Sequence, residues 1–224
     1  MTLLRLYSAP MSMFGMKVHV AALEKGIALE LIMVPFTDDH RYDPKHPEVL
    51  RVNPKGQVPV LLHDGVEIFD STQILEYLED LTPTRPLWPA ERGARAEARL
   101  LEHKSDEVFF PQIVRLMGLQ HDLNGEVAKA ARDSACAYYL ELESRLAASG
   151  YLAGSYSFAD IAFYMAQVFA ERLGAPMTDA SQNLLKWRAA MTLRPAVAAV
   201  MRPFADYLAA HGRPIPEFLV GVGA

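Results

Sequence analysis

The chain has 224 residues, 51% hydrophobic and 22% charged, which is enough apolar sequence for one large or two small domains and argues against disorder. Its net charge of −5 at pH 7 argues against a nucleic-acid-binding surface, because such a surface requires clustered basic residues. The single cysteine excludes an internal disulfide and is typical of a reducing compartment, so we expect a cytoplasmic protein.

The first part of the chain alternates strand and helix patterns. The predicted elements are a strand at 3–7, a helix at 16–24, a strand at 28–36, a hairpin of two strands at 58–62 and 66–69, and a helix at 71–80. Lys25-Gly26 ends the first helix, and Asp64-Gly65 is a pair typical of hairpin turns. Because a helix between two strands is the crossover that parallel strands need, the first 36 residues are predicted to form a βαβ unit.

The pattern changes at residue 81, where LTPTRPLWPA places three prolines in ten residues. Proline cannot continue a helix, so we expect a linker at 82–90 between a first domain at 1–81 and a second domain at 91–224. The second domain shows no strand pattern and about five long helical segments. Breaks between these segments are expected near 124–125, 149–150, 174–176 and 194–195. Pro111, inside the first segment, predicts a kink.

The segment SAPMSMFGMKV, residues 8–18, joins the first strand to the first helix. Such a turn presents unpaired backbone N–H groups and the positive end of a helix dipole, which suits an anion or an activated nucleophile. Ser12 lies just before the predicted helix, where serine is also a preferred N-cap residue. The residue pattern alone leaves both uses of Ser12 open.

Four stretches, in order, carry a resemblance to the cytosolic glutathione S-transferases. They are LYSAPMSMFGMKV at 6–18, NPKGQVPVL at 53–61, FDSTQILEYLED at 69–80 and YLAGSYSFADIAF at 151–163. The resemblance covers nearly the whole chain, and the first stretch is similar to the serine-type tau and phi classes. It implies a thioredoxin-like α/β first domain with the order βαβ-α-ββα and an all-α helical bundle as the second domain. It also implies a transferase that joins the glutathione thiolate to a hydrophobic electrophile.

The resemblance implies that Ser12 is the catalytic residue. It lies six residues before Val18, as the thiol-activating hydroxyl does in serine-type members of the family. A hydroxyl that donates to sulfur near a helix N-terminus favours the thiolate, which is the nucleophile. Ser8 is a weaker alternative nearer the strand, and Tyr7 is interpreted as a core residue.

The motif Gln57-Val58-Pro59 is implied to bind glutathione. The family holds this proline in the cis form, and the Val58 backbone pairs with the extended tripeptide as an added strand would. Gln57 is expected to hydrogen-bond one end of the tripeptide. The alternative is an ordinary proline at the start of an edge strand.

Asp70-Ser71 is the second implied glutathione-binding motif. The backbone N–H groups and the Ser71 hydroxyl would bind the γ-glutamyl carboxylate, while Asp70 pairs with the α-amino group. Asp70 and Gln73 also match a helix capping box, and both roles are compatible. For the glycyl carboxylate, three candidates precede Gln57 in the sequence: Lys55, His46 and Lys45.

An apolar pocket for the electrophile is expected to take side chains from both domains. The candidates are Met11, Met13, Phe14, Phe110, Val114 and Met117. Methionine suits a pocket that accepts varied shapes, although Met and Phe at helical spacing are also the usual residues of a core. Ser157 and Asp160 match a capping box, which we assign to the folding of the second domain.

Other chemistries find little support in the sequence. The seven histidines include no pair at metal-ligand spacing, so we expect no metal and no cofactor, with glutathione as a cosubstrate. We find no run of about 18 uncharged apolar residues that could span a membrane. Cys136 lies within a long helical stretch and is not expected to replace Ser12.

The resemblance also implies a homodimer. Two alternatives to the transferase remain open. One is a glutathione-dependent isomerase, dehalogenase or peroxidase that uses the same first domain, and the other is a non-catalytic binding protein with the same scaffold.

Overall fold

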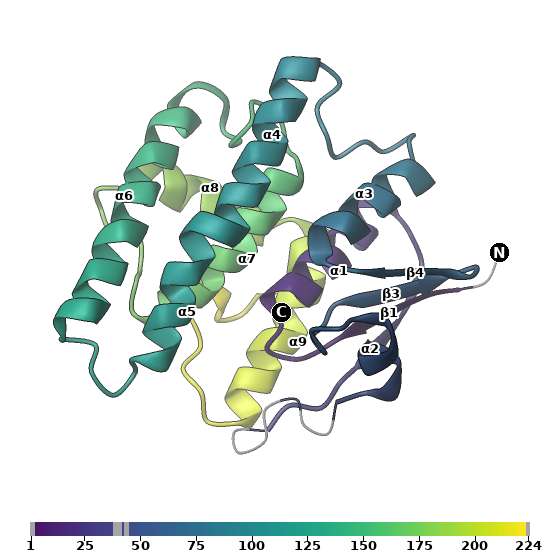
Figure 1. The fold of residues 1–224 in the computed structure, drawn as a ribbon. Coiled ribbons are helices and arrows are strands. Elements are labelled where there is room, and N and C mark those ends of the chain that lie inside the picture. The colour runs from purple at the N-terminus through teal and green to yellow at the C-terminus, as the bar shows by residue number, and fades with distance from the viewer. Residues whose placement is uncertain (1–2, 38–41, 43–44, 223–224) are drawn as a thin grey trace. The chain divides into compact units, whose positions relative to one another are not determined.

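The computed structural model describes residues 3–37, 42 and 45–222, apart from the side chains of residues 147–149. The chain divides into two compact units, residues 1–86 and 87–224, and this division falls within the proline-rich segment expected to be a linker. Figure 1 shows strands and helices in the first unit and helices in the second.

In the residues described for the first unit, the strands form a four-stranded sheet. Its elements are β1 (Leu4–Ser8), α1 (Met13–Lys25), β2 (Leu29–Met33), α2 (Pro47–Val52), β3 (Val60–His63), β4 (Val66–Phe69) and α3 (Ser71–Leu81). The strand order is β2-β1-β3-β4, in which β1 and β2 are parallel and β3 is antiparallel to both of its neighbours. The predicted order βαβ-α-ββα and the thioredoxin-like expectation are confirmed.

The two faces of this sheet are covered by different helices. On one face, α2 packs through Val49 against a cluster that includes Tyr7, Val60 and Leu62. Helices α1 and α3 contact each other and lie on the opposite side of the sheet from α2 (Figure 1). Because strand side chains alternate between faces, the fully buried Leu6 points to the α1 side and Tyr7 to the α2 side.

The register of the sheet brings three chain segments to one edge. Tyr7 pairs with Val60, and Val60 pairs with Phe69. The end of β1, the start of β3 and the end of β4 therefore lie side by side along one edge of the sheet, an edge formed by strand ends and not by an outer strand. The segment before β3 and the segments after β1 and β4 are the three that the sequence singled out for glutathione.

The second unit consists of helices. They are α4 (Arg92–Lys104), η1 (Ser105–Phe109), α5 (Phe110–Gly118), α6 (Glu126–Ser149), α7 (Phe158–Leu173), α8 (Gln182–Thr192), α9 (Pro195–Ala210) and the short turn η2 (Glu217–Leu219). The all-α prediction is confirmed, with α4, η1 and α5 forming the first of the five long segments. No described helix combines the length and the apolar character needed to cross a membrane.

Helix α7 forms the centre of this unit. Its Phe163 ring lies 5.3 Å from the rings of Phe109 and Trp187, and 5.7 Å from the ring of Tyr138. Nearly every residue of α7 is buried. The unit therefore has its own aromatic core.

The sequence predicts a kink at Pro111, and the structure has the π-helical turn η1 directly before α5, the helix whose first turn holds Pro111. Proline has no N–H to donate to the carbonyl one turn earlier, so a regular helix cannot run through it unchanged. The N–H of Phe110 instead reaches the carbonyl of Ser105, which widens the turn by one residue.

Candidate functional site

Ser12 occupies the turn between β1 and α1 as the N-cap of the helix. Its Oγ accepts a hydrogen bond from the backbone N–H of Gly15 at 3.0 Å, and its carbonyl accepts one from the N–H of Met16 at 3.0 Å. This cap explains why α1 begins at Met13, three residues before the predicted start. A hydroxyl that accepts one hydrogen bond still has its own hydrogen to donate, so capping leaves Ser12 able to donate to a sulfur anion.

The neighbouring candidates of β1 are buried. Ser8 is 2% exposed and ends the strand, with its carbonyl accepting from the N–H of Val34 at 2.7 Å. Tyr7 is also 2% exposed, and its ring lies 4.8 Å from the ring of His46. The interpretation of Tyr7 as a core residue is confirmed.

Gln57, Val58 and Pro59 lie directly before β3, and the Val58–Pro59 peptide bond is cis. The Asn53 side chain, which was not among the candidates from the sequence, hydrogen-bonds to this segment. Asn53 is 4% exposed, its Nδ2 donates to the Gln57 carbonyl at 2.7 Å, and its Oδ1 accepts from the Lys55 N–H at 2.9 Å. Asparagine at the start of a turn that contains Pro and Gly often hydrogen-bonds the backbone of that turn, and NPKG has this pattern.

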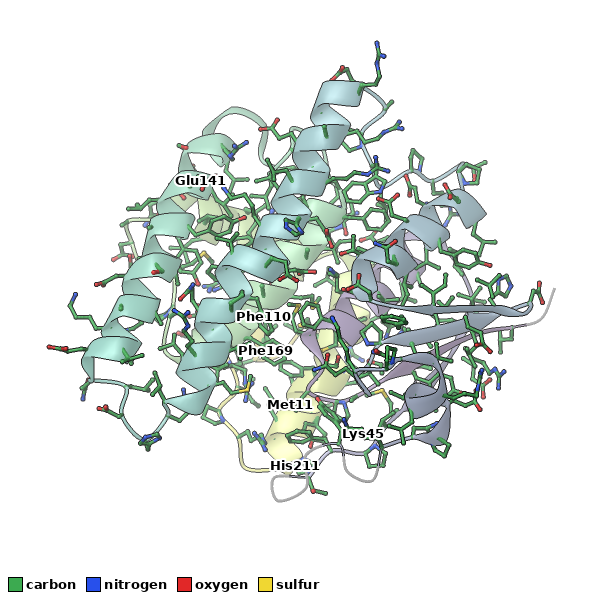
Figure 2. The ribbon with its side chains drawn as sticks, viewed as in Figure 1. Met11, Lys45, Phe110, Glu141, Phe169 and His211 are labelled. Carbon is green, nitrogen blue, oxygen red and sulfur yellow. The ribbon has the colours of Figure 1, made fainter. Side chains whose placement is uncertain are left out.

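The three candidates for the glycyl carboxylate are placed differently. The Nδ1 of His46 accepts the N–H of Glu48 at 3.2 Å and thereby caps α2. The Lys55 side chain is exposed. The Nζ of Lys45 lies 2.8 Å from the point that a Cβ on Gly56 would occupy, so its amino group stands beside the turn that leads to Gln57. Figure 2 labels Lys45 and Met11, which both belong to the first unit.

Asp70 and Ser71 begin α3 at the same edge of the sheet. Oδ1 of Asp70 accepts the N–H groups of Thr72 at 3.0 Å and Gln73 at 3.3 Å, so the capping role is present. A carboxylate offers about four acceptor positions, which leaves room for a ligand amino group as well. Asp70 has a positive φ of 75°, and Ser71 is 4% exposed at the first position of the helix.

The candidates for the apolar pocket divide between exposed and buried positions. Met13 is 2% exposed and lies in the core of the first unit, while Met11 and Phe14 are half-buried. In the second unit, Val114 and Met117 are 49% and 45% exposed on one face of α5. The buried Phe110 packs its ring 6.0 Å from the ring of Phe169, and both are labelled in Figure 2.

Burial affects the charge of a histidine in the middle of α1. The pKa of His19, on α1, is lowered because burial disfavours its protonated form. Within the described parts of the chain, no group of three or more His, Cys, Asp or Glu side chains could hold a metal ion. Cys136 is exposed on α6, in the second unit.

Comparison with known families identifies the scaffold. The model of the glutathione S-transferase N-terminal domain matches residues 6–86, and that of the glutathione S-transferase C-terminal domain matches residues 108–195. The chain belongs to the glutathione S-transferase family. The two matches fall in separate units, so both halves of this family's architecture are present.

Individual relatives of this glutathione S-transferase family member cover different shares of their own length. It is 29% identical over 111 residues to a stringent starvation protein A homologue of Coxiella burnetii, a match that covers 49% of each protein. It is 27% identical over 194 residues to glutathione S-transferase U25 of Arabidopsis thaliana, covering 84% of this chain and 83% of the relative. The chain spans about half or less of the length of the first curated relatives it matches.

The fold has counterparts among solved structures. A glutathione transferase homologue from Sulfitobacter, crystallised with bound glutathione, matches with a TM-score of 0.76 at 23% identity. The match covers 90% of this chain and 98% of that one. At this identity, the similarity establishes that the two share a fold.

Proposed function

We propose that this protein is a glutathione transferase that binds glutathione on its first unit and conjugates the glutathione thiolate to a hydrophobic electrophile. The observation that carries the proposal is the placement of Ser12. Its hydroxyl is held at the N-terminus of α1 by the Gly15 N–H, at the edge where the turns before β3 and α3 also lie.

The stabilisation that the thiolate needs is modest. A free thiol has a pKa of about 8.5, so only about 3% of it is thiolate at pH 7. Lowering this pKa by about two units makes the thiolate the major species and corresponds to about 2.7 kcal/mol of stabilisation. A hydrogen bond from the Ser12 hydroxyl and the positive end of α1 both act in that direction.

The reaction itself needs no group from the chain that forms a covalent bond. The thiol proton passes to solvent, the sulfur electron pair forms a bond to the electrophilic carbon, and the leaving group departs with the electrons of the broken bond. The protein supplies the position of the two reactants and the stabilisation of the anion.

The tripeptide would lie along the shared edge of the sheet. In this proposal the Val58 backbone and Gln57 bind its middle and one end, while Asp70 and Ser71 bind the γ-glutamyl group. For the glycyl carboxylate, the placement of the Lys45 amino group beside Gly56 favours Lys45 over Lys55 and His46. The Sulfitobacter homologue with bound glutathione supports glutathione as the ligand.

The electrophile site, the oligomeric state and the cellular location are proposed from the family resemblance. On the first unit, the electrophile would contact Met11 and Phe14, the pocket candidates there that are not fully buried. We propose that the protein acts as a homodimer in the cytosol, where glutathione is abundant and thiols stay reduced.

The test is conjugation of an aryl halide by Ser12→Ala. We expect the rate at pH 7 to fall by up to about 25-fold, because the thiolate fraction drops from about 76% to about 3% when the thiol pKa returns to about 8.5, while glutathione still binds. Ser134→Ala, which removes an exposed hydroxyl on α6, is the matched control and should keep full activity. Calorimetry that shows no binding of glutathione to the unaltered protein at millimolar concentration would refute the proposal and favour a non-catalytic binding protein.

A further inference from the structure

Gly15 lies in the first turn of α1, where alanine would ordinarily be the better residue. Its φ is not in the left-handed region, so an alanine could adopt the same backbone conformation. A Cβ at this position would nevertheless stand 2.0 Å from the Ser8 Oγ and 3.0 Å from the Ser8 Cβ. The space beside Gly15 is therefore already filled by the side chain of Ser8.

Ser8 has little freedom to give way. It pairs with Met33 in the parallel register of β1 and β2, and its carbonyl accepts the N–H of Val34 at 2.7 Å. Its side chain is 2% exposed, so rotation of the hydroxyl would turn it into other packed atoms. The sheet thus fixes the Ser8 Cβ, and α1 must adjust if Gly15 acquires a side chain.

An adjustment of α1 at this point would reach Ser12. The Ser12 Oγ accepts the Gly15 N–H at 3.0 Å, and the added Cβ would stand 3.1 Å from that same Oγ. An added Cβ on residue 15 would therefore press against the Ser12 hydroxyl. It would also displace the backbone N–H that this hydroxyl accepts.

We propose that Gly15 is a positioning residue for catalysis. Its missing side chain lets the first turn of α1 rest on Ser8 at the end of β1, and this contact sets where the Ser12 hydroxyl meets the glutathione sulfur. The inference rests on the proposed function of Ser12, but the packing relationship between Ser8 and Gly15 can be measured independently of activity.

The first test is Gly15→Ala. We expect the pKa of the bound glutathione thiol, followed by thiolate absorbance, to move toward that of free glutathione. We expect kcat/KM for an aryl halide to fall by about ten- to a hundredfold, because a displacement of about 1 Å can cost about a hundredfold in rate. Gly118→Ala is the matched control, because Gly118 ends α5 with nothing within 4 Å of an added Cβ. It should leave both readings unchanged.

The second test removes the contact between the Ser8 side chain and the Cβ added at position 15. Ser8→Gly in the Gly15→Ala background removes both Ser8 atoms that crowd the new Cβ. It should restore most of the thiol pKa shift and of kcat/KM, and raise the thermal midpoint above that of Gly15→Ala alone. The double variant also keeps the test open if Gly15→Ala by itself fails to fold.

Two results would overturn the inference. One is a Gly15→Ala protein with the unaltered thiol pKa, rate and midpoint, and the other is a double variant that recovers none of them. If the unaltered protein conjugates no electrophile, the proposed function fails instead. The thermal midpoints of the unaltered protein, of Ser8→Gly and Gly15→Ala alone and of the double variant then still decide whether Ser8 and Gly15 depend on each other.

Discussion

The indole N–H of Trp187 donates to Oδ1 of Asp160 at 2.9 Å and links α8 to the first turn of α7. The N–H groups of Leu152 and Ser157 donate to the same carboxylate at 3.0 Å each. These bonds favour the ionised form, but complete burial outweighs them and raises the pKa of Asp160 to about 6. The predicted capping box is thus one part of a larger buried network.

The raised pKa predicts that Asp160 makes the protein more stable as the solution is acidified. Its pKa is about 3.9 in the unfolded chain, so the folded state binds the proton more tightly between the two values. From pH 7 to pH 5 the contribution should grow by about 1 kcal/mol. The measurement is the urea stability of the unaltered protein minus that of Asp160→Asn at each pH. A difference that stays constant or shrinks toward pH 5 would contradict the assignment.

Lys25 predicts a large loss of stability on substitution. Although it is 1% exposed, its Nζ donates to Oε2 of Glu79 at 2.7 Å and to the carbonyls of Thr82 and Arg85 at 2.9 and 2.8 Å. Lys25→Met leaves a carboxylate and two carbonyls without this donor, and we expect a loss of about 3 kcal/mol in urea denaturation.

The control for this prediction is an exposed lysine. Lys129 pairs with Asp133 on the surface of α6 and is 68% exposed, so Lys129→Met should cost no more than about 0.5 kcal/mol. Equal losses for Lys25→Met and Lys129→Met would show that the Lys25 contacts contribute no more than a surface pair.

Asp70 allows its capping and ligand roles to be separated. Asp70→Asn keeps a side-chain acceptor for the Thr72 N–H and tolerates the positive φ, but it removes the negative charge. If Asp70 pairs with the α-amino group of glutathione, the KM for glutathione should rise about tenfold while the urea midpoint stays unchanged.

Asp70→Ala completes this comparison, because it should lower the midpoint as well as raise the KM. Glu91→Gln serves as the control, since Glu91 caps α4 through the Ala94 N–H at 2.7 Å. An unchanged KM in Asp70→Asn would leave Asp70 with the capping role alone.

Features set by local sequence could be predicted well. The second hairpin strand has the predicted bounds, Val66–Phe69, and Gly26 ends α1 in the left-handed conformation. Ser157 and Asp160 form their capping box. Each of these depends on residues within a few positions of one another, which is the range over which turn and cap patterns are informative.

Features set by distant contacts could not be predicted. The partners of Lys25 lie 54 to 60 residues away, and Trp187 lies 27 residues from Asp160. The sequence likewise left Met13 open as pocket or core, because the same residue type serves both. For the site, the sequence predicted which turns bind glutathione. The sheet register, which the sequence did not predict, explains why these turns lie at the same edge.

The central claim is that the Ser12 hydroxyl stabilises the glutathione thiolate in addition to capping α1. The most direct measurement is the pKa of the bound thiol in the unaltered protein and in Ser12→Asp. Aspartate still accepts the Gly15 N–H as a cap, but it has no hydrogen for the sulfur and places a negative charge beside it. We expect a thiol pKa about two units below the free value of about 8.5 in the unaltered complex, and at or above the free value in Ser12→Asp. A thiol that titrates alike in both complexes would contradict the claim.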